Sequence, residues 1–274
     1  MSIYGIMAKP VIKWTGSKRS QAKKIISLMP EQYNRYFEPF IGGGSVLYSL
    51  DENHRENAVC SDICEPLMFI WQIIKNYPTM LYDSYKYHWE KFQQDENYYY
   101  EVRSNFNTTK DPFDFFFLTR TCINGKIRFN KKGEFNSAVH HTRSGINPET
   151  IKNIILDWSD KIKNTLFIIC DYNEILKYVK SGDFVYLDPP YFNTKGLYYG
   201  GIDYDAFIDF LRQLCNKGVK YVLSYDGMRG DDNKTVDLPH DVYKRHELLL
   251  SGNSSFDRFK GQKKPVYESV YMNY

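Results

Sequence analysis

Four residues that follow an apolar run have side chains suited to chemistry on an amino group. The run Phe184–Leu187 has the composition of a buried strand, and Asp188-Pro189-Pro190-Tyr191 follows it directly. Such a strand delivers its last residues to the carboxyl edge of an open α/β sheet, where these folds bind ligands. The two prolines end the strand and fix the turns after it. An acid, a backbone carbonyl and an aromatic ring at that edge suit the exocyclic amine of a flat base.

A second group of residues could hold a nucleoside. The stretch Glu38-Pro39-Phe40-Ile41-Gly42-Gly43-Gly44-Ser45 places three glycines between a short strand and a helix. Glycines there let the backbone approach a ligand closely, because no Cβ is in the way. Asp62 follows at the end of the next expected strand, where an acid in Rossmann-like sites accepts hydrogen bonds from ribose hydroxyls. Together these features indicate a cofactor that contains a nucleoside.

A tryptophan near the start of the chain, in the stretch Lys13-Trp14-Thr15-Gly16-Ser17-Lys18, has two interpretations. A large ring at the head of a polar, glycine-containing turn begins a helix poorly unless the ring packs over something. The ring could fill the edge of the core, as buried tryptophans commonly do. Alternatively it could face an adenine or a sulfonium, which it would attract by stacking or by a cation–π contact.

Composition narrows the class of protein. The 274 residues suffice for one large core, or for a core plus a smaller domain. The net charge is only +3, so a nucleic-acid partner would have to meet a local basic patch. The five cysteines are odd in number and form no CxxC pair, which argues for reduced thiols and against disulfides or a zinc site. We expect no metal, no membrane span and a cytoplasmic protein, since no long apolar run or signal-peptide pattern is present.

Alternating patterns predict an α/β sheet interrupted by a second module. Strands are expected over residues 35–39, 57–60, 166–170, 184–187, 221–224, 246–250 and 266–272. Helices are expected over residues 18–28, 45–50, 67–75, 149–164, 174–179 and 204–216. Residues 80–121 are helical and aromatic in pattern, and 128–136 have the pattern of a hairpin with Gly133 in its turn. We therefore expect a sheet domain from residues 1–62 and 164–274, with an insert at 63–163.

The insert contains a basic stretch. Between residues 120 and 143, six basic side chains accompany a single acid, Glu134. Arginine and asparagine pair bidentately with guanine and adenine edges, whereas lysines at a hairpin tip more often meet phosphates. A solvated face without a partner is the alternative. The residues of this stretch that could contact a nucleic acid are Arg120, Asn124, Lys126, Arg128, Asn130, Lys131, Lys132 and Asn136.

Four stretches, in order KWTGSK, FEPFIGGGS, SDICEPL and YLDPPYF, resemble the Dam-type DNA adenine-N6 methyltransferases, also called the D12 class or alpha group. The resemblance covers nearly the whole chain. It implies a Rossmann-like S-adenosylmethionine-dependent methyltransferase sheet flanked by helices, with a smaller, mainly helical target-recognition domain that carries a β-hairpin. It implies S-adenosylmethionine as methyl donor and double-stranded DNA as partner. It fits either a solitary enzyme or one that shares its site with a restriction endonuclease, and we expect a monomer.

The same resemblance implies roles for individual residues. Trp14 and Lys18 would lie at the cofactor, and Glu38, Pro39, Phe40, Gly42, Gly43, Gly44 and Ser45 would surround its methionine part. Asp62 would hold the ribose and Asp171 the adenine ring, while Asp188, Pro189, Pro190 and Tyr191 would be catalytic, with Asp188 also near the cofactor. The hairpin would read the DNA. After Asn136 the sequence SAVHH departs from the Dam pattern, so the recognition site stays unassigned.

The chemistry of the amine gives an independent reason for this interpretation. The exocyclic amine of adenine is a poor nucleophile because its lone pair is delocalised into the ring. If the Asp188 carboxylate and the Pro189 carbonyl each accept one N–H, the nitrogen is drawn toward tetrahedral geometry and its lone pair becomes available. Extruding the base from a duplex costs a few kcal/mol, and stacking on Tyr191 would return about 1–3 kcal/mol.

Two alternatives remain open at this point. Related motifs occur in methyltransferases that act on RNA adenine or on glutamine amides, although those usually have asparagine in place of Asp188 and often lack a basic insert. The other alternative is an inactive DNA-binding module that kept the fold. The intact Asp188–Tyr191 set argues against it.

Overall fold

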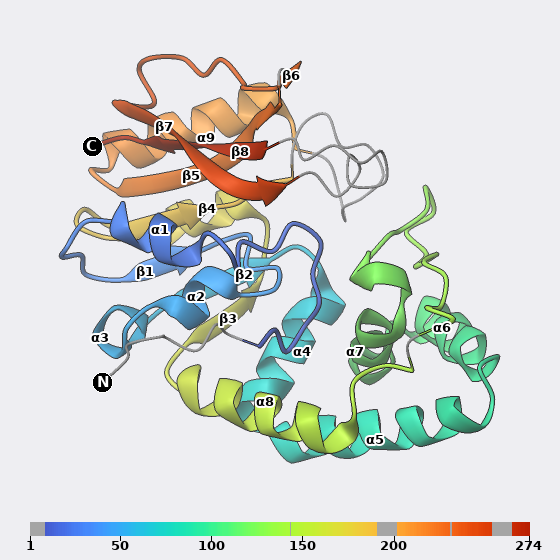
Figure 1. The fold of residues 1–274 in the computed structure, drawn as a ribbon. Coiled ribbons are helices and arrows are strands. Elements are labelled where there is room, and N and C mark those ends of the chain that lie inside the picture. The colour runs from blue at the N-terminus through green and yellow to red at the C-terminus, as the bar shows by residue number, and fades with distance from the viewer. Residues whose placement is uncertain (1–8, 143, 191–201, 231, 254–264) are drawn as a thin grey trace, which may run out of the picture.

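A mixed β-sheet forms one half of the protein (Figure 1). The computed structural model describes residues 9–142, 144–190, 202–230, 232–253 and 265–274. Its strands are β1 (Tyr36–Glu38), β2 (Val59–Asp62), β3 (Leu166–Ile169), β4 (Phe184–Leu187), β5 (Lys220–Arg229), β6 (Asp232–Asn233), β7 (Arg245–Asn253) and β8 (Pro265–Met272). Their order is β3-β2-β1-β4-β5-β8-β7, with β6 paired to β5. The strands from β3 to β5 are parallel, and β8 is antiparallel to both of its neighbours. This topology confirms the predicted Rossmann-like class.

Helices cover both faces of the sheet and continue into a second lobe. Those near the sheet are α1 (Ala22–Ser27), α2 (Ser45–Ser49), α3 (Glu52–Arg55), α4 (Glu65–Asn76), α8 (Pro148–Lys161), α9 (Tyr204–Asn216) and the 3-10 helix η2 (Tyr172–Lys177). The second lobe contains α5 (Pro78–Gln94), α6 (Tyr98–Thr109), α7 (Pro112–Thr121) and the short 3-10 helix η1 (Ile123–Gly125). Among the described residues, no helix has the length and apolar character needed to cross a membrane.

Strand residues alternate between two apolar cores, one on each face of the sheet. In β4, Phe184 and Tyr186 belong to one core, and Val185 and Leu187 belong to the other; all four are buried. α1, α4 and α8 supply side chains to the first core, and α9 packs its apolar face on the second. A strand covered on both faces needs a continuous apolar run, which is why this strand could be recognised from the sequence.

The second lobe extends the first core rather than forming a separate one. α7 is buried from Asp114 to Thr121, and Phe115 stacks on Phe106 of α6 with ring centres 4.7 Å apart. Phe129 and Phe135, which belong to the hairpin after α7, contact Phe115 in turn. In Figure 1, α5 lies beneath α6 and α7 and packs against α8, which extends from there beneath the sheet half. The aromatic content of the insert is therefore largely used for packing.

Differences from the expected elements have local causes. The strand at 184–187 and the helix at 204–216 have the predicted bounds. The helix expected over 174–179 is instead the 3-10 helix η2, which begins earlier because the Asp171 carboxylate accepts a hydrogen bond from the Asn173 backbone N–H. β5 and β7 run beyond their predicted ends because antiparallel pairing with β8 continues there. The short elements α3 and β6 were not predicted.

Candidate active site

Four acidic residues meet at one edge of the sheet. Glu38 ends β1, Asp62 ends β2, Asp171 follows β3 and Asp188 follows β4. These strands are parallel, so their carboxyl ends lie at the same edge, and all four residues line one pocket. The pocket contains about 1020 Å³ of empty space when its open mouth is included.

The residues predicted to hold a cofactor all line this pocket. They are Trp14, Lys18, Glu38, Pro39, Phe40, Gly42, Gly43, Gly44, Ser45, Asp62, Asp171 and Asp188. Pro189 and Pro190 line it as well, whereas Tyr191 lies outside the described residues. Sequence reasoning missed Ile63, which is 48% exposed in the pocket wall. Its position directly after the acid that ends β2 is the signal that could have identified it.

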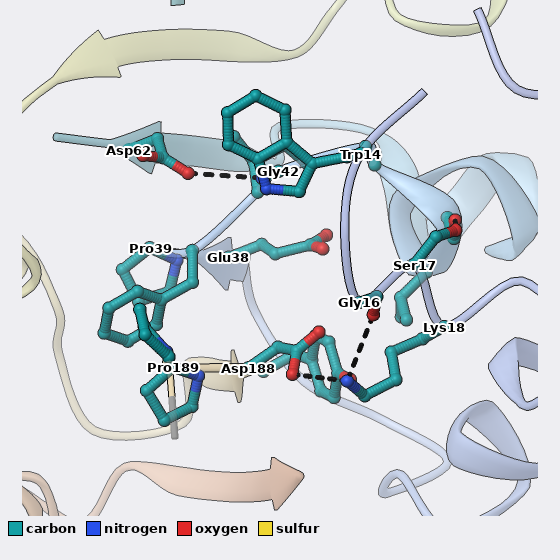
Figure 2. Close-up of a pocket in the computed structure, with 18 of the residues that line it drawn as sticks. Trp14, Gly16, Ser17, Lys18, Glu38, Pro39, Gly42, Asp62, Asp188 and Pro189 are labelled. Atoms are coloured by element: carbon teal, nitrogen blue, oxygen red, sulfur yellow. Dashed lines mark hydrogen bonds and ion pairs between the residues drawn. The ribbon is translucent and has the colours of Figure 1, made fainter. Parts of the chain in front are cut away.

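The glycine turn after β1 is held by its neighbours. The Gly42 N–H donates to Asp62 Oδ2 at 3.3 Å (Figure 2), and the Gly42 carbonyl accepts a hydrogen bond from Trp71 Nε1 at 3.1 Å. Gly42 and Gly44 have φ angles of +44° and +64°, a region that favours glycine. The other oxygen of Asp62 accepts from the Cys64 N–H at 3.0 Å. Burial raises the Asp62 pKa to about 6 despite these hydrogen bonds.

Glu38 provides a buried carboxyl at the floor of the pocket. Its side chain is 3% exposed and accepts a hydrogen bond from the Tyr36 hydroxyl at 2.8 Å. Burial, helped by the nearby Asp188, raises its pKa to about 8, although the Tyr36 hydrogen bond lowers it. A carboxyl in this state favours the neutral form until a cation binds beside it.

An ion pair joins the beginning of the chain to the end of β4. Lys18 Nζ lies 2.7 Å from Asp188 Oδ1 and donates to the Gly16 carbonyl at 3.2 Å (Figure 2). Burial raises the Asp188 pKa to about 6, although the Lys18 ammonium opposes this shift. Asp188 is therefore largely ionised at neutral pH and still basic enough to accept a proton.

Trp14 forms a wall of the pocket and also contributes to the core. Its ring packs edge-on against Phe115 of α7, with ring centres 6.5 Å apart. It also lies against the glycine turn, because a Cβ on Gly42 would come within 2.6 Å of Trp14 Cδ1. Phe40 and Tyr172, which also line the pocket, stack with their ring centres 5.4 Å apart. Both interpretations of Trp14, core packing and ligand contact, are compatible with this position.

The predicted hairpin is present as a short, irregular one. Phe129 and Phe135 form its bridge, and Gly133 has a φ of +75° in the turn. From α6, the Asn107 amide accepts from the Phe135 N–H at 2.7 Å and donates to the Phe135 carbonyl at 3.0 Å. These bonds fix the hairpin on the helical lobe. Its exposed polar side chains are Arg128, Lys131, Lys132, Glu134 and Asn136, and Asn124 and Lys126 are exposed just before it.

Two of the candidate DNA-binding residues, Arg120 and Asn130, form hydrogen bonds within the protein that stabilise its fold. Arg120 is 5% exposed, and its guanidinium donates to the Pro10 carbonyl at 2.8 Å. Burial lowers its pKa to about 10. The prediction that Arg120 contacts DNA is therefore corrected, because the side chain faces inward from α7. Asn130 uses its side-chain oxygen to accept the Lys132 and Glu134 N–H groups, so this oxygen organises the hairpin turn.

Comparisons with known proteins agree with this geometry. A family described as D12 class N6 adenine-specific DNA methyltransferase matches residues 14–250. The type II methyltransferase M.MjaIII of Methanocaldococcus jannaschii is 30% identical over 297 residues, covering 97% of this chain and 99% of the relative. The type II methyltransferase M1.LlaDCHI of Lactococcus lactis is 29% identical, covering 87% and 86% of the two chains. The DNA adenine methylase of Haemophilus influenzae is 29% identical, covering 67% and 64%.

Proposed function

This chain belongs to the D12 class N6 adenine-specific DNA methyltransferases, and from that premise we propose which of its residues carry out the reaction. It is an enzyme that methylates adenine in DNA at N6 in a sequence-specific manner. The observation that supports the residue assignment is the convergence of Glu38, Asp62, Asp171 and Asp188 on one pocket at the carboxyl edge of the sheet.

We propose S-adenosylmethionine as the cofactor, and the chemistry of the pocket fits it. The carboxyl groups of Glu38, Asp62 and Asp171 offer acceptors for hydroxyl, amine and ammonium groups. The partly exposed Trp14 and the exposed Ile63 offer apolar surface for a ring. When bound, the cofactor supplies an electrophilic methyl group on a sulfonium. Asp62 would accept hydrogen bonds from the ribose hydroxyls and Asp171 would meet the adenine ring, as the positions at the ends of β2 and β3 suggest.

Asp188 and Pro189 would activate the target amine. The Asp188 carboxylate accepts one N–H and the Pro189 carbonyl accepts the other, which localises the lone pair on the nitrogen. The pKa of Asp188, about 6 because of burial, lets the carboxylate take the surplus proton that the methylated nitrogen carries. Tyr191, which lies outside the described residues, would stack on the extruded base and offset part of the cost of flipping.

The insert at 63–163 would recognise the DNA, with residues 1–62 and 164–274 forming the catalytic domain. α4, the first helix of the insert, packs against β2 and β3, and α8, the last, packs against α4 and α5. The reading elements would then be α5–α7 and the hairpin. The exposed Arg128 and Asn136 are suited to base edges, and Lys131 and Lys132 at the hairpin tip are suited to phosphates. Since two relatives are named type II methyltransferases, we further propose a monomeric enzyme that protects a site from a cognate endonuclease.

An Asp188→Ala variant tests the assignment. We expect transfer of a tritiated methyl group to genomic DNA to be lost by about a thousandfold, within the range of acid–base contributions, while DNA binding in a gel-shift assay is retained. Asp209→Asn is the matched control, because Asp209 is exposed on α9 and pairs with Arg212. Single-molecule mapping of modified adenines with the wild-type enzyme would give the recognition site. Wild-type turnover in Asp188→Ala would contradict the catalytic assignment.

A further inference from the structure

β8 places a second carboxylate, that of Glu268, beside Lys18 and Asp188, and this carboxylate has no role in the proposed activation of the amine. Glu268 is 16% exposed, and its Oε2 lies 3.5 Å from Lys18 Nζ. The same ammonium lies 2.7 Å from Asp188 Oδ1. Lys18 is itself only 5% exposed. One buried ammonium therefore sits between two carboxylates, nearer to the one that must receive the target amine.

The backbone around Glu268 is irregular on both sides. Asp226 pairs with Glu268 and Met228 with Tyr267, so Gly227 of β5 is an extra, bulged residue. Only glycine permits this close approach, because a Cβ on Gly227 would lie 2.4 Å from the Tyr267 carbonyl oxygen and 2.9 Å from Glu268 Cα. Bulges redirect side chains and are common beside active sites.

The opposite neighbour of β8 has a second bulge at the same level. Leu250 pairs with Tyr267 and Gly252 with Val266, which leaves Ser251 of β7 as the extra residue. The Ser251 hydroxyl donates to Glu268 Oε1 at 3.3 Å. Glu268 Oε2, in contrast, is buried and has no hydrogen bond among the described residues. One oxygen is thus anchored to β7, and the other is directed at Lys18 with capacity to accept a hydrogen bond.

We propose that Glu268 is a positioning residue that receives the Lys18 ammonium when the target amine takes its place at Asp188. This inference rests on the proposed function, in which the Asp188 carboxylate accepts an N–H of adenine. The target amine and the ammonium share the Asp188 carboxylate, and a movement of Lys18 away from its 2.7 Å contact would free Asp188 Oδ1 as an acceptor. Glu268 Oε2 provides a second anionic partner within a short movement of the lysine side chain, and the positive charge stays paired throughout.

The transfer of Lys18 also changes Asp188 itself. With the ammonium at Asp188, the carboxylate is a weaker base; with the ammonium at Glu268, it is a stronger one and better able to take the proton from the methylated nitrogen. Glu38 on β1 and Tyr186 on β4 interact electrostatically with Asp188. On β5, Asp226 lies opposite Glu268 in the strand register and pairs with Arg229. Glu268 differs from all of these because it contacts Lys18 directly.

The test compares single-turnover methyl transfer in Glu268→Gln, Glu268→Asp and wild type across pH. We expect Glu268→Gln to slow transfer by about tenfold or more, a loss typical of a perturbed acid–base step, with cofactor affinity unchanged. We also expect the acidic limb of the pH–rate profile of this variant to move to lower pH, because removal of a neighbouring negative charge lowers the Asp188 pKa. Glu268→Asp should restore the position of the limb. Glu247→Gln is the matched control, since Glu247 pairs with Arg245 on β7 and is partly exposed.

The outcomes separate this inference from the proposed function. If wild type fails to methylate adenine N6, the proposed function is wrong. If wild type is active and Glu268→Gln keeps both its rate and its acidic limb, only the role of Glu268 is refuted. Should Glu268→Gln fail to fold, Ser251→Ala replaces it, because this variant releases Oε1 alone; a smaller shift of the limb in the same direction supports the proposal, and an unchanged profile overturns it.

Discussion

Replacing Gly44 with alanine tests whether the turn after β1 is fixed by the aromatic rings beneath it. Gly44 has a φ of +64°, where an L-residue costs about 1–2 kcal/mol. The new Cβ would lie 2.9 Å from Trp71 Cη2 and 3.2 Å from Trp158 Cη2. Both rings are fully buried, so the contact adds an overpacking cost of about 1–3 kcal/mol. The free energy of unfolding should therefore fall by about 2–5 kcal/mol.

Gly133 supplies the matched control for this prediction. Its φ is +75°, yet a Cβ there would meet nothing within 4 Å. Gly133→Ala should therefore show only the backbone cost of about 1–2 kcal/mol. Urea unfolding of both variants, followed by circular dichroism, measures the difference. Equal destabilisation by the two substitutions would show that the tryptophans yield to the new methyl group, and the rigid-turn argument would be refuted.

Two further predictions concern buried charged groups. Burial raises the Glu38 pKa from 4.5 to about 8. Between these two pH values the folded protein holds a proton on Glu38 that the unfolded chain releases. The contribution of this proton to the free energy of unfolding is complete below pH 4.5 and is lost as pH rises toward 8. Glu38→Gln should therefore flatten the fall of thermal stability with pH in this window, and an unchanged slope would exclude Glu38 as its source. Arg120→Met should lower the free energy of unfolding by about 2–3 kcal/mol, because the carbonyl of Pro10 loses a charged donor. Arg120→Met should leave unchanged the slope of the logarithm of the DNA-binding constant against the logarithm of salt concentration, whereas Lys131→Ala should reduce the magnitude of that slope by about 1. A reduced slope in Arg120→Met would show that Arg120 contacts DNA.

The placement of the pocket acids could be predicted because it follows from topology. Asp62, Asp171 and Asp188 each come after an apolar run, and parallel strands bring their carboxyl ends to one edge. Phe184–Leu187 was recognisable because a strand buried on both faces cannot alternate apolar with polar residues. These inferences needed only local patterns and the geometry of a parallel sheet.

Other features depend on contacts between distant segments. A run of basic residues does not reveal which of them faces inward, and Arg120 is buried because α7 is covered on all sides by the core and by the segment around Pro10. Glu268 looks like an ordinary strand residue in the sequence. Its direction toward Lys18 depends on bulges at Gly227 and Ser251, and a bulge is visible only once the register of two neighbouring strands is known.

The segment from Pro10 to Lys18 links the hairpin to the catalytic centre. The Pro10 carbonyl accepts a hydrogen bond from the buried Arg120 guanidinium. At the base of the hairpin, Thr15 Oγ1 accepts a hydrogen bond from the Ile127 N–H at 3.3 Å. Three residues later, Lys18 forms the ion pair with Asp188. A displacement of the hairpin on DNA would therefore act on a short, anchored segment that ends at the ammonium between Asp188 and Glu268. The hairpin that we propose reads the DNA and the ammonium that pairs with Asp188 are thus both attached to this one short segment.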